Sequence, residues 1–341
     1  MKVSFLVTYY NQEQYVRQSL DSILAIKMPC DWEILVGDDG SNDGTTAIVR
    51  EYMERFPDQI SLYVMPRDPQ KTYSSVLRAS ANRLNLLEKA TGDFFCTLDG
   101  DDWYCDTEFL VDALAVFVEN PAVSVVGFGY QQVTDGVAGE PHTLPSRMDR
   151  TCVDKKEYLN QYYLPAGACV HRIAWGQDRI EYIRNIGFFD DNDIVINSLN
   201  FGQLYAINRV IYSYRQTAGS TYNSMSFVEQ AVLNVQGLDV DLKLLDSHYR
   251  ENLLRRNATQ ILVMFIWKNR LRAVLGEAKY QRYLEESEKL PDSVTYKILK
   301  YDTLPGNGKK QVNSIVFYAM RRNIQFSVKL FLKKYLRGNG A

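Results

Sequence analysis

The sequence predicts an α/β protein with a mostly parallel β-sheet, helices on both faces of that sheet, and an α-helical C-terminal extension. The first part of the 341-residue chain alternates short apolar runs with segments of helical periodicity, which is typical of parallel sheets. From about Phe227 to Leu290 long helical patterns dominate. Hydrophobic residues form 46% of the chain and charged residues 23%, so there is enough apolar surface for a packed core.

Strands are predicted where short apolar runs are rich in β-branched and aromatic residues. They are Lys2–Val7, Glu33–Val36, Ile60–Val64, Phe94–Leu98 and Val123–Phe128. Helices are predicted where apolar residues recur at three- and four-residue spacing. They are Gln12–Leu24, Thr45–Phe56, Ala81–Ala90 and Thr107–Phe117. A turn is expected at Leu304–Gly308, where proline and glycine interrupt the helical pattern.

Two parts are expected from this change of pattern and from the usual size of domains. Residues 1–225 would form the sheet domain and residues 226–341 the helical extension with a basic tail. The stretch 309–341 contains eight lysines and arginines and no acidic residue. A basic amphipathic helix there would lie on an anionic membrane, and the alternative is a terminal helix docked on the protein with its lysines in solvent.

Composition excludes several classes of protein. A formal net charge of −2 gives no signature of nucleic-acid binding. Three histidines are too few and too scattered for a histidine-based metal site. The five cysteines are odd in number and lack C-x-x-C spacing, so we expect them to be reduced and mostly buried. With no signal peptide and no apolar stretch near the ~20 residues that span a bilayer, a cytoplasmic location is expected, at the inner face of the membrane if the tail binds lipid.

The acidic turn Asp99-Gly100-Asp101-Asp102 follows the fourth predicted strand. Three carboxylates within four residues repel one another unless a cation neutralises them. Oxygen ligands suit a hard ion such as Mg²⁺ or Mn²⁺, which is usually shared between one or two carboxylates and substrate phosphates. Because Asp-x-Asp alone is a weak motif, a solvated polar turn is an equal alternative from this segment by itself.

Polar residues also follow the first two predicted strands. The second strand leads into Asp38-Asp39, whose carboxylates could accept hydrogen bonds from a nucleoside. The loop that continues to Thr45 could equally be a capped connection into the next helix. Since ligands bind beyond the carboxyl ends of parallel strands, these segments and the acidic turn are expected at one edge of the sheet.

Three segments together resemble the family 2 glycosyltransferases with the GT-A fold. They are Val3–Asn11, Glu33–Thr45 and Ala90–Trp103. Their order and spacing match the family over roughly residues 1 to 225. The resemblance implies an inverting, metal-dependent transfer from a nucleotide-diphosphate sugar to a hydroxyl of a glycan or lipid-linked acceptor, as in surface polysaccharide synthesis. UDP is the family's commonest donor nucleotide.

The resemblance also implies roles for single residues. Thr8, Tyr10 and Asp39 would contact the nucleotide base, and Asn11 and Asp38 join them as substrate-binding candidates. In the acidic turn Asp99 would lie near the ribose. Asp101 would hold the Mn²⁺ or Mg²⁺ ion. The share of Asp102 in that site is left open, and Asp102 is a substrate-binding candidate.

A base that deprotonates the acceptor is implied in the segment Gly187–Ile196. Asp190-Asp191 stands where the family usually has Glu-Asp, which makes Asp191 the candidate base and Asp193 its rival. All of these acids could instead cap the helix that follows. Desolvation beside a second carboxylate would raise the pKa of Asp191 and suit it to proton abstraction.

Basic residues are expected near the nucleotide. Arg215 resembles an arginine that approaches the diphosphate after the last strand of the family's domain, with a surface ion pair as the alternative. The family's Arg-Asn pair has no clear counterpart here, so Arg78, Arg83 and Lys71 all remain candidates, and Arg78 is selected among them.

Other functions remain open at this point. A nucleotidyltransferase shares a similar sheet and metal chemistry, but it would be expected to carry a glycine-rich basic loop where this chain has Tyr9–Glu13. A phospho-acceptor signalling domain could use Asp38-Asp39 to bind Mg²⁺. A non-catalytic binder of nucleotide sugars is disfavoured by acids at all three segments.

Overall fold

The computed structural model describes the chain except residues 69, 72, 218–221, 223, 291 and 322–341. The chain forms two compact units. The first consists of Met1–Tyr158 and Tyr162–Ser220, and the second of Leu159–Gln161 and Thr221–Ala341. Each unit is described by itself.

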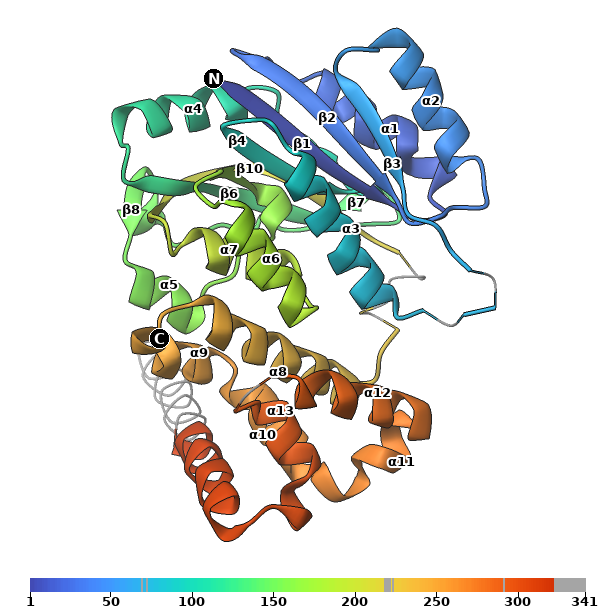
Figure 1. Ribbon diagram of the computed structural model, residues 1–341. Helices are drawn as coiled ribbons and strands as arrows, with labels where there is room; N and C mark the ends of the chain where they lie inside the picture. The colour runs from blue at the N-terminus through green and yellow to red at the C-terminus, as the bar shows by residue number, and fades with distance from the viewer. Residues whose placement is uncertain (69, 72, 218–221, 223, 291, 322–341) are drawn as a thin grey trace, which may run out of the picture. The chain divides into compact units, whose positions relative to one another are not determined.

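The first unit is built on one mixed sheet (Figure 1). Its strands are β1 Lys2–Tyr9, β2 Asp31–Asp38, β3 Ile60–Val64, β4 Phe94–Asp99, β5 Trp103–Tyr104, β6 Val123–Thr134, β7 Val137–Ala138, β8 Thr151–Val153, β9 Cys169–Arg172 and β10 Gln203–Gln216. Their order is β3-β2-β1-β4-β9-β6-β10-β5, with β7 beside β6 and β8 beside β10. Strands β1 to β4 pair in parallel, and β9 runs antiparallel to β4 and β6.

Helices cover both faces of this sheet. The helices that begin in this unit are α1 Glu13–Leu24, α2 Thr45–Arg55, α3 Ser75–Lys89, α4 Phe109–Glu119, α5 Lys155–Gln161, α6 Gln177–Ile186 and α7 Asp191–Ser198, and the last three residues of α5 belong to the second unit. In Figure 1, α3, α6 and α7 lie on the face of the sheet turned to the viewer. The alternate residues Val3, Phe5 and Val7 of β1 are buried in one core cluster with apolar residues of α1, α2 and α4. The predicted sheet with helices on both faces is therefore confirmed.

Several predicted boundaries are wrong, and two of them bear on the site. Helix α3 begins at Ser75 rather than Ala81, because the side chain of Ser74 accepts a hydrogen bond from the backbone N–H of Leu77 and starts the helix earlier. Strand β10 extends to Gln216 and so includes Arg215, which was expected after the last strand. Register shifts near Val210 let β10 stay paired with β6 along its whole length.

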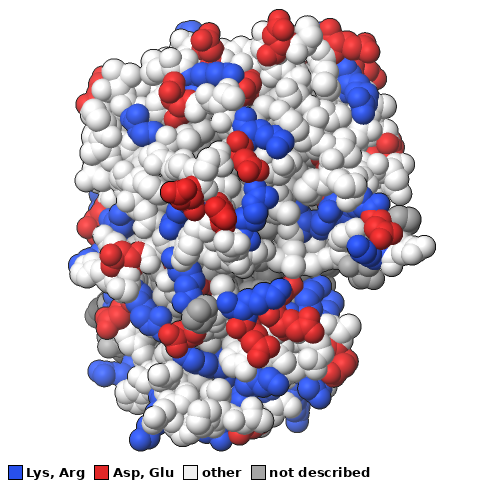
Figure 2. Space-filling view, viewed as in Figure 1, with Lys and Arg blue, Asp and Glu red and all other residues white. Residues whose placement is uncertain are grey.

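The cysteines also differ from expectation. All five are free. Cys96 and Cys169 are buried, Cys30 is half-buried, and Cys105 and Cys152 are exposed, so the expectation that most are buried is wrong. Figure 2 shows acidic and basic side chains interspersed over the visible face of the first unit, so no single sign of charge dominates this face.

The second unit is helical, as predicted for the extension. Its helices are α8 Phe227–Leu244, α9 Arg250–Arg256, α10 Ala258–Ile266, α11 Leu271–Leu275, α12 Glu277–Glu288 and α13 Val294–Leu299. A further helix begins at residue 306, so the expected turn at Leu304–Gly308 ends sooner than predicted. No helix within the described ranges has the length and apolar character needed to cross a membrane. The basic tail beyond residue 321 lies outside the described residues.

Candidate active site at the carboxyl edge of the sheet

The parallel register brings the polar ends of three strands together. Thr8 of β1 is paired with Asp99 of β4 on one side and with Gly37 of β2 on the other. The hydroxyl of Thr8 donates a hydrogen bond of 3.0 Å to Asp99, and the backbone N–H of Gly100 donates one of 2.9 Å to the carbonyl of Thr8. The candidate segments that are about 90 residues apart in the chain therefore share one edge, as the sheet topology predicts.

Asp39 lies beyond β2 between two arginines. Its side chain is nearly buried and forms ion pairs with Arg67 and Arg78. The Nε of Arg78 donates to Asp39 over 2.5 Å. The guanidinium carbon of Arg67 lies 3.9 Å from the ring centroid of Tyr10, within the range of a cation–π contact. The predicted residues Tyr10, Asp39 and Arg78 therefore form one cluster, and Arg67 joins it.

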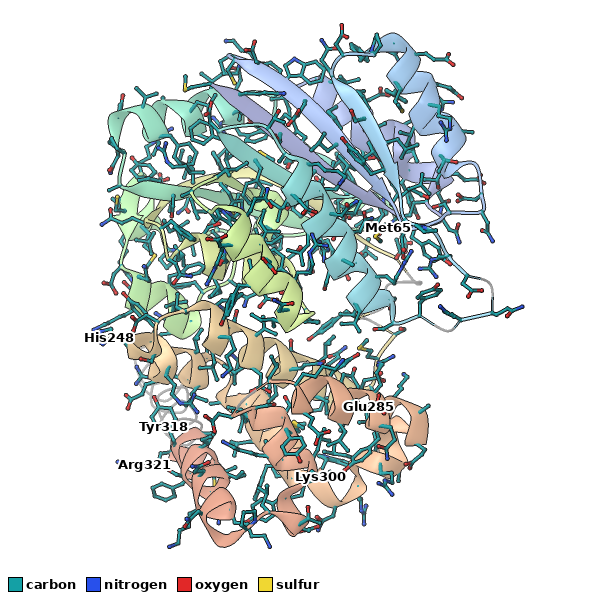
Figure 3. All side chains as sticks on the ribbon, viewed as in Figure 1. Met65, His248, Glu285, Lys300, Tyr318 and Arg321 are labelled. Atoms are coloured by element: carbon teal, nitrogen blue, oxygen red, sulfur yellow. The ribbon has the colours of Figure 1, made fainter. Side chains whose placement is uncertain are left out.

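Arg67 was missed from the sequence, although a signal for it existed. It follows β3 by three residues, and β3 is the parallel neighbour of β2. Figure 3 shows Met65 at the end of β3, beside this edge of the sheet. The backbone N–H of Met65 donates to the carbonyl of Asp38 over 2.8 Å, and its own carbonyl accepts from Arg78 over 3.3 Å. Residues just past β3 therefore belong to the same edge.

Asp38 and Asn11 shape the loops at this edge. Asp38 is fully buried, and its carboxylate accepts hydrogen bonds from the backbone of Gly40 and Ser41 and from the Ser41 hydroxyl. The Oδ1 of Asn11 accepts from the backbone of the β2–α2 loop over 2.9 Å. The side chains of Asp38 and Asn11 are thus held by the protein's own loops, and their expected substrate contacts stay predictions.

The two adjacent acids of the turn after β4 have different surroundings. Asp102 is 1% exposed; it accepts hydrogen bonds from the hydroxyl of Tyr212 and, over 2.7 Å, from the backbone N–H of Arg215. Burial, with Asp101 and Asp99 nearby, raises the pKa of Asp102 well above its usual value. Asp102 thus anchors the turn to β10, and its expected part in substrate binding stays a prediction.

Asp101 is the more accessible of the two. Burial and then the charge of Asp99 raise the pKa of Asp101 to about 6, so its ionised form lacks full compensation by the protein. Gly100 is required beside it, because a Cβ there would lie 2.0 Å from the ring of Tyr9. An oxygen ligand with an uncompensated charge is the donor chemistry that fits a hard divalent cation.

Arg215 closes the other side of the acidic turn. Its Nε donates to the backbone carbonyl of Asp101 over 2.7 Å. Its guanidinium lies between the rings of Tyr15 and Trp103, 4.5 Å and 4.6 Å from their centroids. These contacts hold the guanidinium at the acidic turn, and the approach of Arg215 to a donor diphosphate stays a prediction.

Helix α7 separates the three acids of its first turn by role. Asp190 is the N-cap and accepts from the backbone N–H groups of Asn192 and Asp193, while the Asp193 carboxylate accepts from the backbone N–H of Asp190 over 2.8 Å. This capping box engages Asp190 and the rival Asp193 in holding the helix. Asp191 instead faces Arg83, with Nη2 and Oδ1 3.5 Å apart.

Asp191 has the electrostatic setting of a general base. Burial raises the pKa of Asp191 to about 7; Arg83 acts against this shift, and Asp99 and Asp190 add to it. A pKa near the working pH suits proton abstraction. Of the other basic candidates, Arg83 lies between Asp191 and Asp99, whereas Lys71 is 70% exposed and lies 3.8 Å from Asp68, so Lys71 does not join this cluster.

The fold and the polar edge are those of GT-A enzymes, which act on nucleotide sugars. A family model described as glycosyl transferase family 2 matches residues 4–181, just over half of the chain. The chain belongs to glycosyltransferase family 2. The expected family and enzyme class are thereby confirmed, and the nucleotidyltransferase, signalling and non-catalytic alternatives are set aside.

Curated relatives resemble parts or most of the chain. EpsE of Bacillus subtilis (strain 168), named as a glycosyltransferase, is 37% identical over 101 residues, which are 30% of this chain and 33% of EpsE. The match spans about a third of the length of the first curated relatives. The uncharacterized glycosyltransferase MG060 homolog of Mycoplasma pneumoniae is 24% identical over 285 residues, 82% of this chain and 87% of that protein.

Solved structures share the fold. Staphylococcus aureus TarS 1–349 in complex with UDP-GlcNAc has a TM-score of 0.57 and 19% identity, covering 97% of this chain and 92% of that chain. The mannosyltransferase PcManGT from Pyrobaculum calidifontis, in complex with GDP-Man and Mn²⁺, has a TM-score of 0.50 and 15% identity, covering 94% and 86%. At these identities the likeness concerns the fold alone.

Proposed function

We propose that this glycosyltransferase moves a sugar from a UDP-sugar to a hydroxyl of a glycan or lipid-linked acceptor in surface polysaccharide synthesis, with inversion at the anomeric carbon. The observation that carries the proposal is the position of Asp191. The pKa of its carboxylate is raised to about 7, and Arg83 contacts both Asp191 and Asp99, which lies at the edge of the sheet proposed to bind the donor. A base on the opposite side of the sugar from the leaving group is what a single displacement needs.

Each group of residues has a part in the proposed reaction. Tyr10, Asp39, Arg67 and Arg78 hold the nucleoside, and Thr8 and Asp99 orient the ribose. Asp191 accepts the proton of the acceptor hydroxyl as that oxygen attacks the anomeric carbon. Arg215, held at the acidic turn, adds positive charge near the departing diphosphate, which favours its departure.

A divalent ion, Mn²⁺ or Mg²⁺, belongs to this proposal. Asp101 would hold it, because its carboxylate is an oxygen ligand whose pKa is raised by burial and by Asp99. Such an ion, when bound, stabilises the charge of the leaving diphosphate as a Lewis acid. Asp102 would stabilise the acidic turn by accepting the hydrogen bond of the Tyr212 hydroxyl.

The choice of UDP rests on the family's usual donor and on a relative of known substrate. TarS of Staphylococcus aureus, named as a poly(ribitol-phosphate) β-N-acetylglucosaminyltransferase, is 33% identical over 122 residues, 35% of this chain and 19% of that protein. Its structure contains UDP-GlcNAc. We therefore propose UDP-GlcNAc as the first donor to assay.

A thermal-shift panel of nucleotides and nucleotide sugars, each with and without Mn²⁺, tests the donor and the metal together. A bound ligand raises the melting temperature by mass action. We expect UDP and UDP-GlcNAc to stabilise the protein only when Mn²⁺ is present. Stabilisation by GDP ligands alone, or equal stabilisation with and without metal, would contradict the proposal. Product analysis of the anomeric configuration then tests inversion.

We further propose a cytoplasmic location, with contact at the inner face of the membrane through residues 309–337 and through exposed apolar residues of the second unit. Large apolar side chains are exposed there: Ile266, Trp267, Phe317 and Met320. Lys268 follows Trp267 in the sequence and lies 4.3 Å from the ring centroid of Phe265. Arg321, labelled in Figure 3, follows Met320. Aromatic residues beside basic ones are typical of surfaces that rest on anionic lipid.

Vesicle flotation tests the membrane contact. We expect the full chain to float with vesicles containing phosphatidylglycerol and less with neutral vesicles. Replacing both Ile266 and Trp267 by serine should reduce flotation, whereas Phe227→Ser, at an exposed residue of α8, should not. Equal behaviour of both variants would argue against this surface.

A further inference from the structure

Arg83 joins the donor side of the site to the acceptor side. Its Nη2 lies 2.9 Å and 3.0 Å from the two carboxylate oxygens of Asp99 and 3.5 Å from Oδ1 of Asp191. The side chain is only 13% exposed. One nitrogen atom therefore contacts a carboxylate at the end of β4 and a carboxylate at the start of α7.

The charge of Arg83 is needed at this place. The charges of Asp99 and Asp190 both act to raise the pKa of Asp191, because like charges repel. Burial acts to lower the pKa of Arg83, but Asp99 and Asp191 together raise it above its usual value, so the guanidinium stays charged. Among the described residues, Arg83 is the cation that pairs with both Asp99 and Asp191.

Helix α3 holds the backbone of Arg83 in a fixed position. The hydroxyl of Ser80, one turn earlier, accepts a hydrogen bond of 3.1 Å from the backbone N–H of Phe189, in the segment that leads into α7. The amide of Asn82 donates to the carbonyl of Gly37 in β2 over 2.9 Å. One turn of α3 is thus tied both to the sheet and to the start of α7, so Arg83 reaches both carboxylates from a rigid support.

We propose that Arg83 is a positioning residue that holds the Asp191 carboxylate in its place relative to a donor bound at Asp99. This inference rests on the proposed function, in which Asp191 is the base. Arg78, five residues earlier on α3, contacts Asp39 instead. The two arginines of one helix therefore have separate effects: Arg78 acts on binding of the nucleoside, and Arg83 acts on the proton-transfer step.

The kinetic test compares Arg83→Gln, Arg83→Lys and the control Arg78→Gln in UDP release from UDP-GlcNAc with Mn²⁺. Misplacing a catalytic group by about 1 Å costs on the order of 100-fold in rate. We expect Arg83→Gln to lower kcat by about 10- to 100-fold with donor KM changed less than about threefold, and Arg83→Lys to lie between it and the wild type. Arg78→Gln should mainly raise donor KM.

Three kinetic results would overturn the inference. They are a kcat of Arg83→Gln within twofold of the wild type, a loss confined to KM, and an Arg83→Lys variant no better than Arg83→Gln. If Arg83→Gln does not fold, Arg83→Lys alone decides the matter: a lower kcat with unchanged KM supports the inference, and a raised KM contradicts it.

A stability cycle gives a readout that needs no turnover. Asp191→Asn should raise the melting temperature more in the Arg83→Gln background, where Asp191 lacks its cation, than in the wild-type background. Additive effects of the two substitutions would show that Arg83 does not hold Asp191. If the wild type releases no UDP from any UDP-sugar, the proposed function fails, while this cycle still decides whether the contact exists.

Discussion

The hydroxyl of Tyr212, in β10, donates a hydrogen bond to the carboxylate of Asp102, which lies 110 residues earlier in the chain. The backbone of Arg215 donates to the other oxygen of the same carboxylate. Both oxygens of Asp102 are therefore engaged by β10, whereas its neighbour Asp101 remains half-buried. This contact divides the acidic turn into a supporting residue and a residue available to a cation.

Substitution of the two acids should separate these roles. We expect Asp101→Asn to abolish the Mn²⁺-dependence of UDP binding with little change in melting temperature. Asp102→Ala should destabilise the protein by roughly 1 to 3 kcal/mol, because it leaves the buried Tyr212 hydroxyl without its acceptor. Calorimetric titration of UDP with and without Mn²⁺, together with urea unfolding, measures both effects. The reverse pattern would assign the metal to Asp102.

Asp191→Asn should abolish transfer yet keep metal-dependent nucleotide binding. Loss of a general base typically costs a factor of about 100 to 10,000 in rate. The control is Asp193→Ala, which breaks the capping box of α7 and should cost about 1 kcal/mol of stability while transfer continues. Full transfer by Asp191→Asn would refute the assignment of the base.

The transfer rate should depend on the protonation of Asp191. Its pKa is raised to about 7, mainly by burial, and only the ionised form accepts a proton. We expect kcat to rise about tenfold per pH unit below pH 7 and to level off above it. A profile of UDP release that is flat from pH 5.5 to 8 would contradict this.

The same shift has a consequence for stability. A carboxyl group has a pKa near 3.9 in an unfolded chain, so the folded protein binds more protons at Asp191 than the unfolded one between about pH 4 and pH 7. The contribution of Asp191 to the free energy of unfolding therefore falls as pH rises through that window. Urea midpoints of Asp191→Asn should fall less over this window than those of the wild type.

Gly100→Ala should disrupt the acidic turn. A Cβ would lie 2.0 Å from the ring of Tyr9, and Tyr9 is buried and bonded to Ser19, so the ring has no room to move. Overpacking of this kind costs about 1 to 3 kcal/mol, and we expect metal-dependent UDP binding to be lost as well. Gly176→Ala is the matched control, because a Cβ there meets no atom within 4 Å; equal effects of the two would argue against the steric explanation.

Arg67→Met should weaken donor binding. Arg67 pairs with Asp39 and lies over the ring of Tyr10, so its loss disturbs the proposed nucleoside site but leaves Asp191 untouched. We expect donor KM to rise by about tenfold, which corresponds to about 1.4 kcal/mol, with kcat changed less than about threefold. Arg17→Met, at an exposed pair with Glu51, is the control. An effect on kcat alone would place Arg67 outside the nucleoside site.

The sequence by itself determined the α/β class, the helical extension, the family, and the edge of the sheet where the polar segments meet. These follow from local periodicity and from the parallel direction of the strands, since the ends of neighbouring parallel strands share one edge. The capping start of α3 at Ser74 was missed, because a cap depends on the direction of one side chain.

Only the tertiary structure decided between neighbouring residues of like chemistry. Asp38 turns into its own loop while Asp39 meets two arginines, Asp102 turns to β10 while Asp101 does not, and Asp193 caps α7 while Asp191 faces Arg83. Each of these directions depends on a partner or a turn geometry that packing selects, often from a distant part of the chain. The contacts of Arg67 and Arg83 also depend on tertiary structure. The fold, and not the spacing of residues, brings β3, α3 and α7 to one edge of the sheet.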